Sequence, residues 1–264
     1  MIFPLFFAPL ILCLIGTHFV TNTCQQHVIE KVSTFNELPD YLTLHSQITP
    51  SAALVTVDLD HTAFKPKNRE QAGGELWFRN HFQATKDLEQ TLPLYRKLQQ
   101  FLQVEPADHS VIPTIAKMQK AGFPLFALTA RGPEIAAHTA RMLREMGLSF
   151  KETQIPHLEA CINSLENPYL YAQEGVVHAP KGKGDALVSI FNACSLNPAQ
   201  LIHIDDSQKH LDDISSKLAT TYPNTHFTGL LYTGCDHLEQ TYNHESTQPI
   251  IKAWHGKYLP HVNR

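Results

Sequence analysis

Two carboxylates follow directly after a short apolar run. The run Ala53–Val57 is rich in β-branched residues and predicts a strand buried on both faces, and Asp58 and Asp60 come next at a spacing of two. Residues i and i+2 of an extended segment point to the same side. Like charges held this close repel, so an added cation or a shared proton is needed to keep them together. The pair therefore predicts a cation site, and Mg²⁺ suits an all-oxygen site of this kind.

Other polar groups follow later apolar runs. Thr129 ends the predicted strand 124–129, and Asp205 and Asp206 follow the predicted strand 200–204. Lys183 opens a helix, where its charge opposes the helix dipole unless an anion lies nearby. In an open α/β sheet, strand ends that carry polar residues share one edge. The combined set is suited to a phosphoryl group, because carboxylates and Mg²⁺ can hold the anion while one carboxylate attacks.

The elements that must position these residues alternate between strands and helices. This alternation predicts an α/β fold with a mostly parallel, right-handed sheet. The segment Val28–Gln47 has helical apolar spacing interrupted by Pro39, and we expect a broken packing helix there. Residues 150–180 are expected to be irregular apart from a short strand at 175–179. The remaining predicted elements are strands at 124–129, 200–204 and 227–233 and helices at 112–122, 133–146, 183–194 and 211–218.

Composition limits the class of protein. The 264 residues are 43% hydrophobic and 17% charged, which predicts one main globular domain with insertions. A net charge of -4 and the absence of a Lys/Arg run argue against a nucleic-acid partner. The 16 His and 5 Cys show neither metal-ligand spacing nor a CxxC pair, so neither a zinc site nor a disulfide framework is indicated.

The segment Ile2–Val20 is nearly continuous apolar sequence without a charge, and a polar stretch follows it. This pattern predicts an export signal, and hence a periplasmic or secreted protein. The missing Lys/Arg region and cleavage site leave open an uncleaved anchor and N-terminal membrane association. Polar residues before Cys24 argue against a lipid-anchored cysteine. We therefore predict a signal peptide or membrane anchor over residues 1–24 and a catalytic domain over 25–264.

Four motifs in order resemble those of the haloacid dehalogenase (HAD) superfamily, in its phosphatase-type members. The segment Asp58–Thr62 (DLDHT) looks like the family's DxDxT motif, Thr129 and Lys183 match its second and third motifs, and Ile204–Ser207 (IDDS) looks like its acidic fourth motif. His61 departs from the residues more usual at that position. The resemblance implies a three-layer, Rossmann-like, mostly parallel sheet. It also implies a mainly helical cap insertion between the first two motifs, here about residues 65–110.

The same resemblance implies roles for the carboxylates. Asp58 would be the nucleophile that forms an aspartyl-phosphate, and Asp60 the general acid and later base. Asp58, the backbone carbonyl of Asp60, and Asp206 would coordinate Mg²⁺. Asp205 would either ligate the metal directly or lie behind it, and we favour Asp206 as the direct ligand. The implied activity is Mg²⁺-dependent hydrolysis of a small-molecule phosphomonoester.

Other residues are assigned to substrate contacts. Thr129 and Lys183 would bind the phosphate oxygens. Arg131 would either bind substrate or form a surface ion pair, and Trp77 and Phe78 would either line the substrate face of the cap or pack in its core. No motif specifies the substrate or the oligomeric state.

Three other classes of protein share some of these features. A receiver-type signalling domain uses similar residues in a different order, which excludes it. The segment GKGDAL lacks the upstream Gly and the following Ser/Thr of a nucleotide-binding loop. The serious alternative is a non-catalytic secreted or surface binding protein that retains the fold. The intact pair of Asp58 and Asp60 argues against it, since such a protein need not keep Asp60.

Overall fold

The computed structural model describes residues 27–44, 52–68, 72–153 and 155–258. The predicted signal or anchor over residues 1–24, including its apolar segment Ile2–Val20, lies outside these residues. Within the described ranges, no helix combines the length and apolarity that crossing a bilayer requires.

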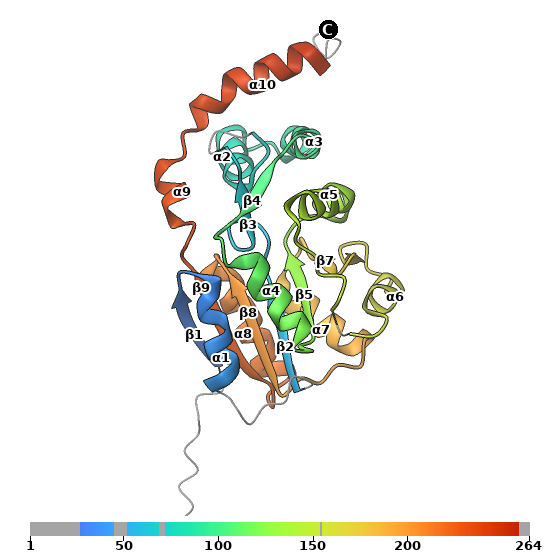
Figure 1. Ribbon diagram of the computed structural model, residues 1–264. Helices are drawn as coiled ribbons and strands as arrows, with labels where there is room; N and C mark the ends of the chain where they lie inside the picture. The colour runs from blue at the N-terminus through green and yellow to red at the C-terminus, as the bar shows by residue number, and fades with distance from the viewer. Residues whose placement is uncertain (1–26, 45–51, 69–71, 154, 259–264) are drawn as a thin grey trace, which may run out of the picture.

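A seven-stranded sheet forms the centre of the molecule (Figure 1). Neighbouring strands pair in parallel, except that the edge strand β6 runs antiparallel to β7. The predicted α/β fold with a mostly parallel sheet is therefore confirmed, and the architecture is consistent with a Rossmann-like fold. In sheet order the strands are β1 (His27–Val32), β9 (His226–Tyr232), β8 (Gln200–Asp205), β2 (Ala53–Val57), β5 (Leu125–Thr129), β7 (Val176–His178) and β6 (Tyr171–Gln173).

Helices cover both faces of this sheet. Val55 and Val57 of β2 point into one apolar cluster and Leu54 into the other, because successive residues of a strand face opposite sides. The first cluster packs under η1, α1, α4 and α5, and the second under α6, α7 and α8. These elements are η1 (Phe35–Glu37), α1 (Leu38–Leu44), α4 (Val111–Lys120), η3 (Pro133–Ile135), α5 (Ala136–Met146), α6 (Leu158–Asn163), α7 (Lys183–Ala193) and α8 (Gln208–Thr221).

The segment between β2 and α4 leaves the sheet and returns to it. Strands β3 (Phe64–Pro66) and β4 (Val104–Pro106) pair antiparallel and carry helices α2 (Glu75–Thr85) and α3 (Leu88–Gln99). We call this unit, residues 64–106, the α2–α3 module. It lies beyond the carboxyl ends of the strands (Figure 1). Trp77 is fully buried within it and Phe78 packs against the same apolar cluster. Of the two roles considered for these residues, the structure shows packing in the core of the module.

Two helices at the end of the described chain extend from the sheet toward this module. They are α9 (Asp236–Thr241) and α10 (His244–Tyr258) (Figure 1). Leu238 packs in the core of the sheet domain, whereas Ile251 packs against Trp77. Arg79 of α2 also forms an ion pair with Glu239 of α9. The two helices therefore fasten the module to the sheet domain.

The predicted broken helix over Val28–Gln47 is wrong. Residues 27–32 form β1, which pairs with β9 along its whole length, from His27 opposite Phe227 to Val32 opposite Tyr232. The helical segment begins only after a capping box formed by Thr34 and Glu37. Pro39 lies in the first turn of α1, where a missing N–H costs no helical hydrogen bond. The region 150–180 is also more regular than predicted, since it contains α6 and β6.

Candidate active site

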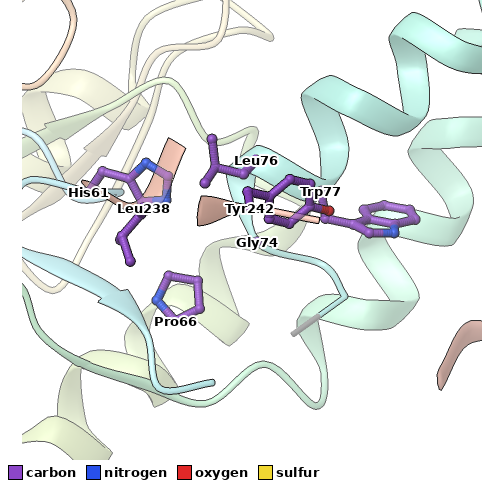
Figure 2. Close-up of a pocket in the computed structure, with 7 residues that line it drawn as sticks. All are labelled: His61, Pro66, Gly74, Leu76, Trp77, Leu238 and Tyr242. Atoms are coloured by element: carbon purple, nitrogen blue, oxygen red, sulfur yellow. The ribbon is translucent and has the colours of Figure 1, made fainter. Parts of the chain in front are cut away.

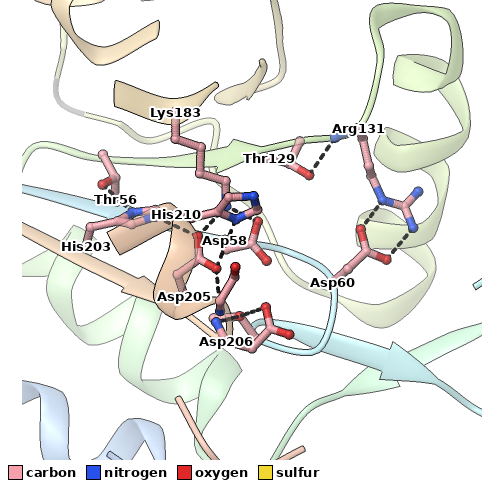
Figure 3. A network of polar contacts seen from close by, with 12 residues as sticks. Thr56, Asp58, Asp60, Thr129, Arg131, Lys183, His203, Asp205, Asp206 and His210 are labelled. Atoms are coloured by element: carbon pink, nitrogen blue, oxygen red, sulfur yellow. Dashed lines mark hydrogen bonds and ion pairs between the residues drawn. The ribbon is translucent and has the colours of Figure 1, made fainter. Parts of the chain in front are cut away.

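Strand register brings the predicted polar residues together. Val57 of β2 lies opposite Ile204 of β8 and Ala127 of β5, so the three strands end at one edge of the sheet. The Asp58 N–H donates to the carbonyl of Ile204 at 2.9 Å, which places Asp58 beside the acidic pair that ends β8. Thr129 ends β5 on the other side of β2. Figure 3 shows Lys183 extending toward Asp58 and Asp205, with Asp206 near them, whereas Asp60 is turned toward Arg131.

A tight turn holds the second carboxylate. The carbonyl of Leu59 accepts hydrogen bonds from the N–H groups of Ala63 at 3.0 Å and Phe64 at 2.9 Å. His61, in the middle of this turn, has a φ of 57°, in the left-handed region that non-glycine residues rarely adopt. We call residues 58–63 the DxD loop. Its reversal brings the chain directly from the site into β3 of the α2–α3 module.

Lys183 joins two of the carboxylates. Its Nζ donates to Asp58 Oδ1 and Asp205 Oδ2, and the side chain is 1% exposed. Burial alone would lower the pKa of Lys183, but the carboxylates of Asp205 and Asp58 outweigh this effect and raise it. Lys183 is therefore a fixed positive charge at the centre of the site, which accounts for a lysine at the start of α7.

Asp205 is fully buried and its oxygens are used by protein partners. Its Oδ2 accepts from Lys183 and from His203 Nε2 at 2.9 Å. Its Oδ1 accepts from the Ser207 N–H at 2.9 Å, and His210 Nδ1 lies 3.3 Å from the same oxygen. Burial would raise the pKa of Asp205, but Lys183 and the two histidines hold it well below its usual range. This geometry suits a residue that positions Lys183.

His203 was missed by the sequence reasoning. It is fully buried in β8, where its Nδ1 lies 2.8 Å from Thr56 Oγ1 while its Nε2 contacts Asp205. Burial lowers the pKa of His203 although Asp205 opposes this shift, so the ring is neutral at pH 7. A histidine inside an otherwise apolar strand was the signal in the sequence that pointed to a buried polar partner.

Asp206 is the more open member of the acidic pair. Its N–H donates to Thr62 Oγ1 at 3.0 Å, and its side chain is 24% exposed. Burial and the carboxylates of Glu75 and Asp58 raise the pKa of Asp206 to about 10. Burial likewise raises the pKa of Asp58, to about 6, although Lys183 opposes the shift. Lys183 alone therefore does not compensate the negative charge of these neighbouring carboxylates.

The donor set fits a hard divalent cation. One carboxylate oxygen from each of Asp58, Asp205 and Asp206 lies within 4.8 Å of the other two, and of the three residues Asp205 is the one whose oxygens both have protein partners. Mg²⁺ binds through one or two carboxylates and keeps several waters, so it needs no closed protein cage. The excess of carboxylate charge and the all-oxygen chemistry are both consistent with Mg²⁺ at this edge.

Asp60 is held by Arg131 rather than directed at an open surface. Arg131 Nε donates to Asp60 Oδ2 at 2.6 Å and Nη2 to Oδ1 at 2.8 Å, while Nη1 donates to Gln99 of α3 at 2.7 Å. The Arg131 side chain is 2% exposed, so the prediction of an ion pair holds but its placement at the surface is wrong. Burial would raise the pKa of Asp60, but Arg131 outweighs it and lowers the pKa. The guanidinium is occupied by protein partners in this geometry.

Thr129 places a buried hydroxyl at the end of β5. It is 1% exposed, and its Oγ1 accepts from the Arg131 N–H at 3.2 Å. Among the residues that the structure describes, no acceptor takes its hydroxyl proton. The hydroxyl can therefore donate to an anion at the strand edge.

Glu75 is a further acidic residue that the sequence did not single out. It begins α2, so the α2–α3 module contributes it to the same region. Burial and the carboxylates of Asp60 and Asp58 raise the pKa of Glu75 to about 8. An acidic residue just after the pair Gly73–Gly74 was the only local signal, and it gave no indication of proximity to Asp58.

Comparison with known proteins gives two matches. Residues 31–261 match the family model described as "Protein of unknown function (DUF2608)". A Chlamydia pneumoniae protein named "Putative outer membrane protein" is 25% identical over 137 residues, which cover 51% of this chain and 51% of that protein. The chain thus spans about half the length of this curated relative. No solved structure matches this chain significantly. Since the family model covers most of the sequence, this chain belongs to the DUF2608 family.

Proposed function

We propose that this protein is a Mg²⁺-dependent phosphomonoester hydrolase of the HAD type, acting through an aspartyl-phosphate. The observation that carries the proposal is the convergence of Asp58, Thr129, Lys183 and Asp206 at the carboxyl edge of the parallel sheet. This set combines a nucleophile, two donors to phosphate oxygens and an acidic cation ligand. It also occurs in the chain order of the motifs that the sequence resembles.

Each residue has a defined task in this proposal. With a pKa of about 6, Asp58 is largely ionised at neutral pH, so one of its oxygens can attack phosphorus. Lys183 and Thr129 donate to the phosphate oxygens. As the new Asp58–phosphate bond forms, the bond to the leaving oxygen breaks and that oxygen takes a proton from Asp60. Water then attacks the aspartyl-phosphate, gives its proton to Asp60 and releases phosphate.

Mg²⁺, held by Asp58, Asp206 and the backbone carbonyl of Asp60, would supply charge neutralisation to the phosphate oxygens. The pair of Asp60 with Arg131 bears on the first step, because it holds Asp60 ionised. The negative charge of an approaching phosphate dianion counteracts the effect of Arg131, because a nearby like charge raises the pKa of the Asp60 carboxyl. Substrate binding would thus convert Asp60 into its acid form, and the same pair would stabilise the base form needed for hydrolysis of the intermediate.

We further propose that the α2–α3 module acts as the cap over the site. Its placement beyond the strand ends and the contact of Gln99 with Arg131 support this role. Because the module also contributes Glu75, its position relative to the sheet affects the charge at the phosphate site. Substrate choice would therefore depend on the module while the chemistry stays on the sheet edge.

We propose that the protein is exported. The uncharged apolar segment Ile2–Val20 supports this, and so does similarity to a protein named as a putative outer membrane protein. A reporter fused after His27 should leave the cytoplasm. A reporter that stays soluble in the cytoplasm would contradict export, whereas an exported full-length protein that remains bound to the membrane would identify the segment as an anchor.

A phosphomonoester panel tests the proposed activity. Purified protein with Mg²⁺ should release phosphate from at least one ester, and Asp58→Asn should release none. If the purified wild-type protein is folded but releases no phosphate from sugar, nucleotide, lipid or amino-acid phosphates, the non-catalytic binding protein is favoured instead.

A further inference from the structure

The DxD loop and the α2–α3 module meet at a second group of possible metal ligands. His61, Glu75 and Asp206 each offer one donor atom, and these three atoms lie within 4.8 Å of one another. The group differs from the all-oxygen set of Asp58, Asp205 and Asp206, because it includes an imidazole nitrogen and shares only Asp206. It also joins two regions of the fold, since Glu75 opens α2.

The position of His61 is an independent observation that points to a ligand. The residue is 3% exposed, yet within the described chain neither ring nitrogen makes a hydrogen bond. The nearest acidic oxygen, Asp206 Oδ2, lies 4.0 Å from His61 Nδ1, which is too far for a hydrogen bond. Among the described residues, only Trp77 Nε1 is a fully enclosed side-chain atom without a hydrogen-bond partner. The ring nitrogens of His61 therefore keep access to the space beside them, where an ion can bind to one of them. Its backbone is moreover held at a φ of 57°.

The surroundings of His61 do not supply the missing partner. The ring faces a small pocket whose walls are mainly apolar (Figure 2). Arg79 is the nearest cation on α2, but its guanidinium is paired with Glu239 of α9. The pocket is lined by His61, Pro66, Gly74, Leu76, Trp77, Leu238 and Tyr242.

We infer that His61, Glu75 and Asp206 form a second cation site, for a divalent transition metal of the Zn²⁺ or Mn²⁺ class. Imidazole suits Zn²⁺, and carboxylates suit Mn²⁺ and are also common zinc ligands. Ligands of a tetrahedral zinc ion lie about 3.3 Å apart, given bond lengths near 2 Å, so the donors need to close by about 1.5 Å or less. The ion would tie the module to the DxD loop and share Asp206 with the catalytic site.

Metal counting tests this inference in the full-length protein. Equilibrium dialysis against Zn²⁺, followed by elemental analysis, should give two equivalents per wild-type chain. His61→Asn should fold, because asparagine tolerates the left-handed backbone. It should lose one equivalent of metal, because its side chain is too short to replace the imidazole as a ligand. Glu75→Gln, which keeps the shape of the side chain, should lose the same equivalent. The rise in Tm that Zn²⁺ produces should shrink in both variants.

Matched controls separate this site from adventitious binding to the many histidines. His157 has the same φ of 57° but is exposed in another region of the fold, and Glu89 occupies the first turn of α3 as Glu75 does that of α2. His157→Asn and Glu89→Gln should keep the wild-type count. If His61→Asn and Glu75→Gln, folded by circular dichroism, also keep it, the inference is wrong.

The outcome is independent of the proposed activity. Asp58→Asn should lose turnover and the catalytic equivalent but keep the equivalent that depends on His61. A wild-type protein without activity that still binds this equivalent would reject the phosphatase and retain the second site. A single equivalent that is lost in Asp58→Asn but retained in His61→Asn would reject the second site.

Discussion

Arg131→Gln should destabilise the protein in a pH-dependent way. The substitution removes both hydrogen bonds from Arg131 to Asp60, at 2.6 and 2.8 Å, and the bond to Gln99 at 2.7 Å. The two charged side chains are 2% and 13% exposed, so solvent screens them little. Removing one partner of a buried ion pair costs about 3–5 kcal/mol, because the other charge stays buried without compensation.

The sign of the pH effect follows from Asp60. Arg131 lowers the pKa of Asp60, so the pair stabilises the fold above the ordinary carboxyl pKa, and this contribution is lost as pH falls through the lowered value. In Arg131→Gln, the unpaired buried carboxyl has a raised pKa and can be protonated. The difference in unfolding free energy between wild type and variant should therefore be largest at pH 7 and should shrink toward pH 4.

Urea unfolding of wild type and variant at pH 7, 5 and 4, with chelator present throughout, measures this difference. Arg96→Gln is the control, because the pair of Arg96 with Glu134 is 47% and 35% exposed and should contribute about 0–1 kcal/mol. A deficit for Arg131→Gln no larger than that of the control at pH 7, or one that grows as pH falls, would refute the reasoning.

Three further predictions concern chemistry, the module and the backbone. Asp60→Asn should slow hydrolysis by roughly 10²- to 10⁴-fold for an alkyl phosphate and by less for an ester of an acidic phenol, measured by rapid quench; equal losses would argue against Asp60 as general acid. Trp77→Ala should lower the free energy of unfolding in urea by about 3–5 kcal/mol, because the ring is fully buried. Trp77→Phe should lower it far less, since Trp77 Nε1 has no hydrogen-bond partner in the described structure to lose. Similar losses for the two variants would contradict the packing role. Gly175→Ala should lower Tm more than Gly122→Ala: both have a positive φ, but only at Gly175 would a Cβ collide with a backbone atom, the Phe150 carbonyl oxygen.

The sheet core could be predicted because its sequence signals are local. Strands β2, β5 and β8 are short apolar runs buried on both faces, and α4, α5 and α7 show helical apolar spacing with start or stop residues. Strand β1 was missed for a physical reason. It lies at the sheet edge and is mostly half-exposed, and Val28 and Val32 also fit a helical spacing. Its pairing with β9, far away in sequence, decides the outcome.

The same division applies to the site. Asp58, Thr129 and Lys183 were recognisable because each stands at the boundary of a predictable element. The partner of Asp60 was not, because Arg131 reaches it across 71 residues of sequence and the turn geometry of the DxD loop decides their contact. Glu75 was equally hidden, since only the packing of the α2–α3 module brings it near Asp206. Long-range contacts therefore carried the information that the sequence lacked.

Detection of a phosphoryl group on Asp58 tests the central claim most directly. The protein, mixed with Mg²⁺ and an ester that it hydrolyses, is quenched in acid within the first turnover, reduced with borohydride and mapped by mass spectrometry. Borohydride converts an aspartyl-phosphate into homoserine, so the proposed mechanism predicts homoserine at position 58, absent without Mg²⁺ and absent in Asp58→Asn. Turnover without modification of Asp58, or with a phosphoryl group on another residue such as His210, would contradict it.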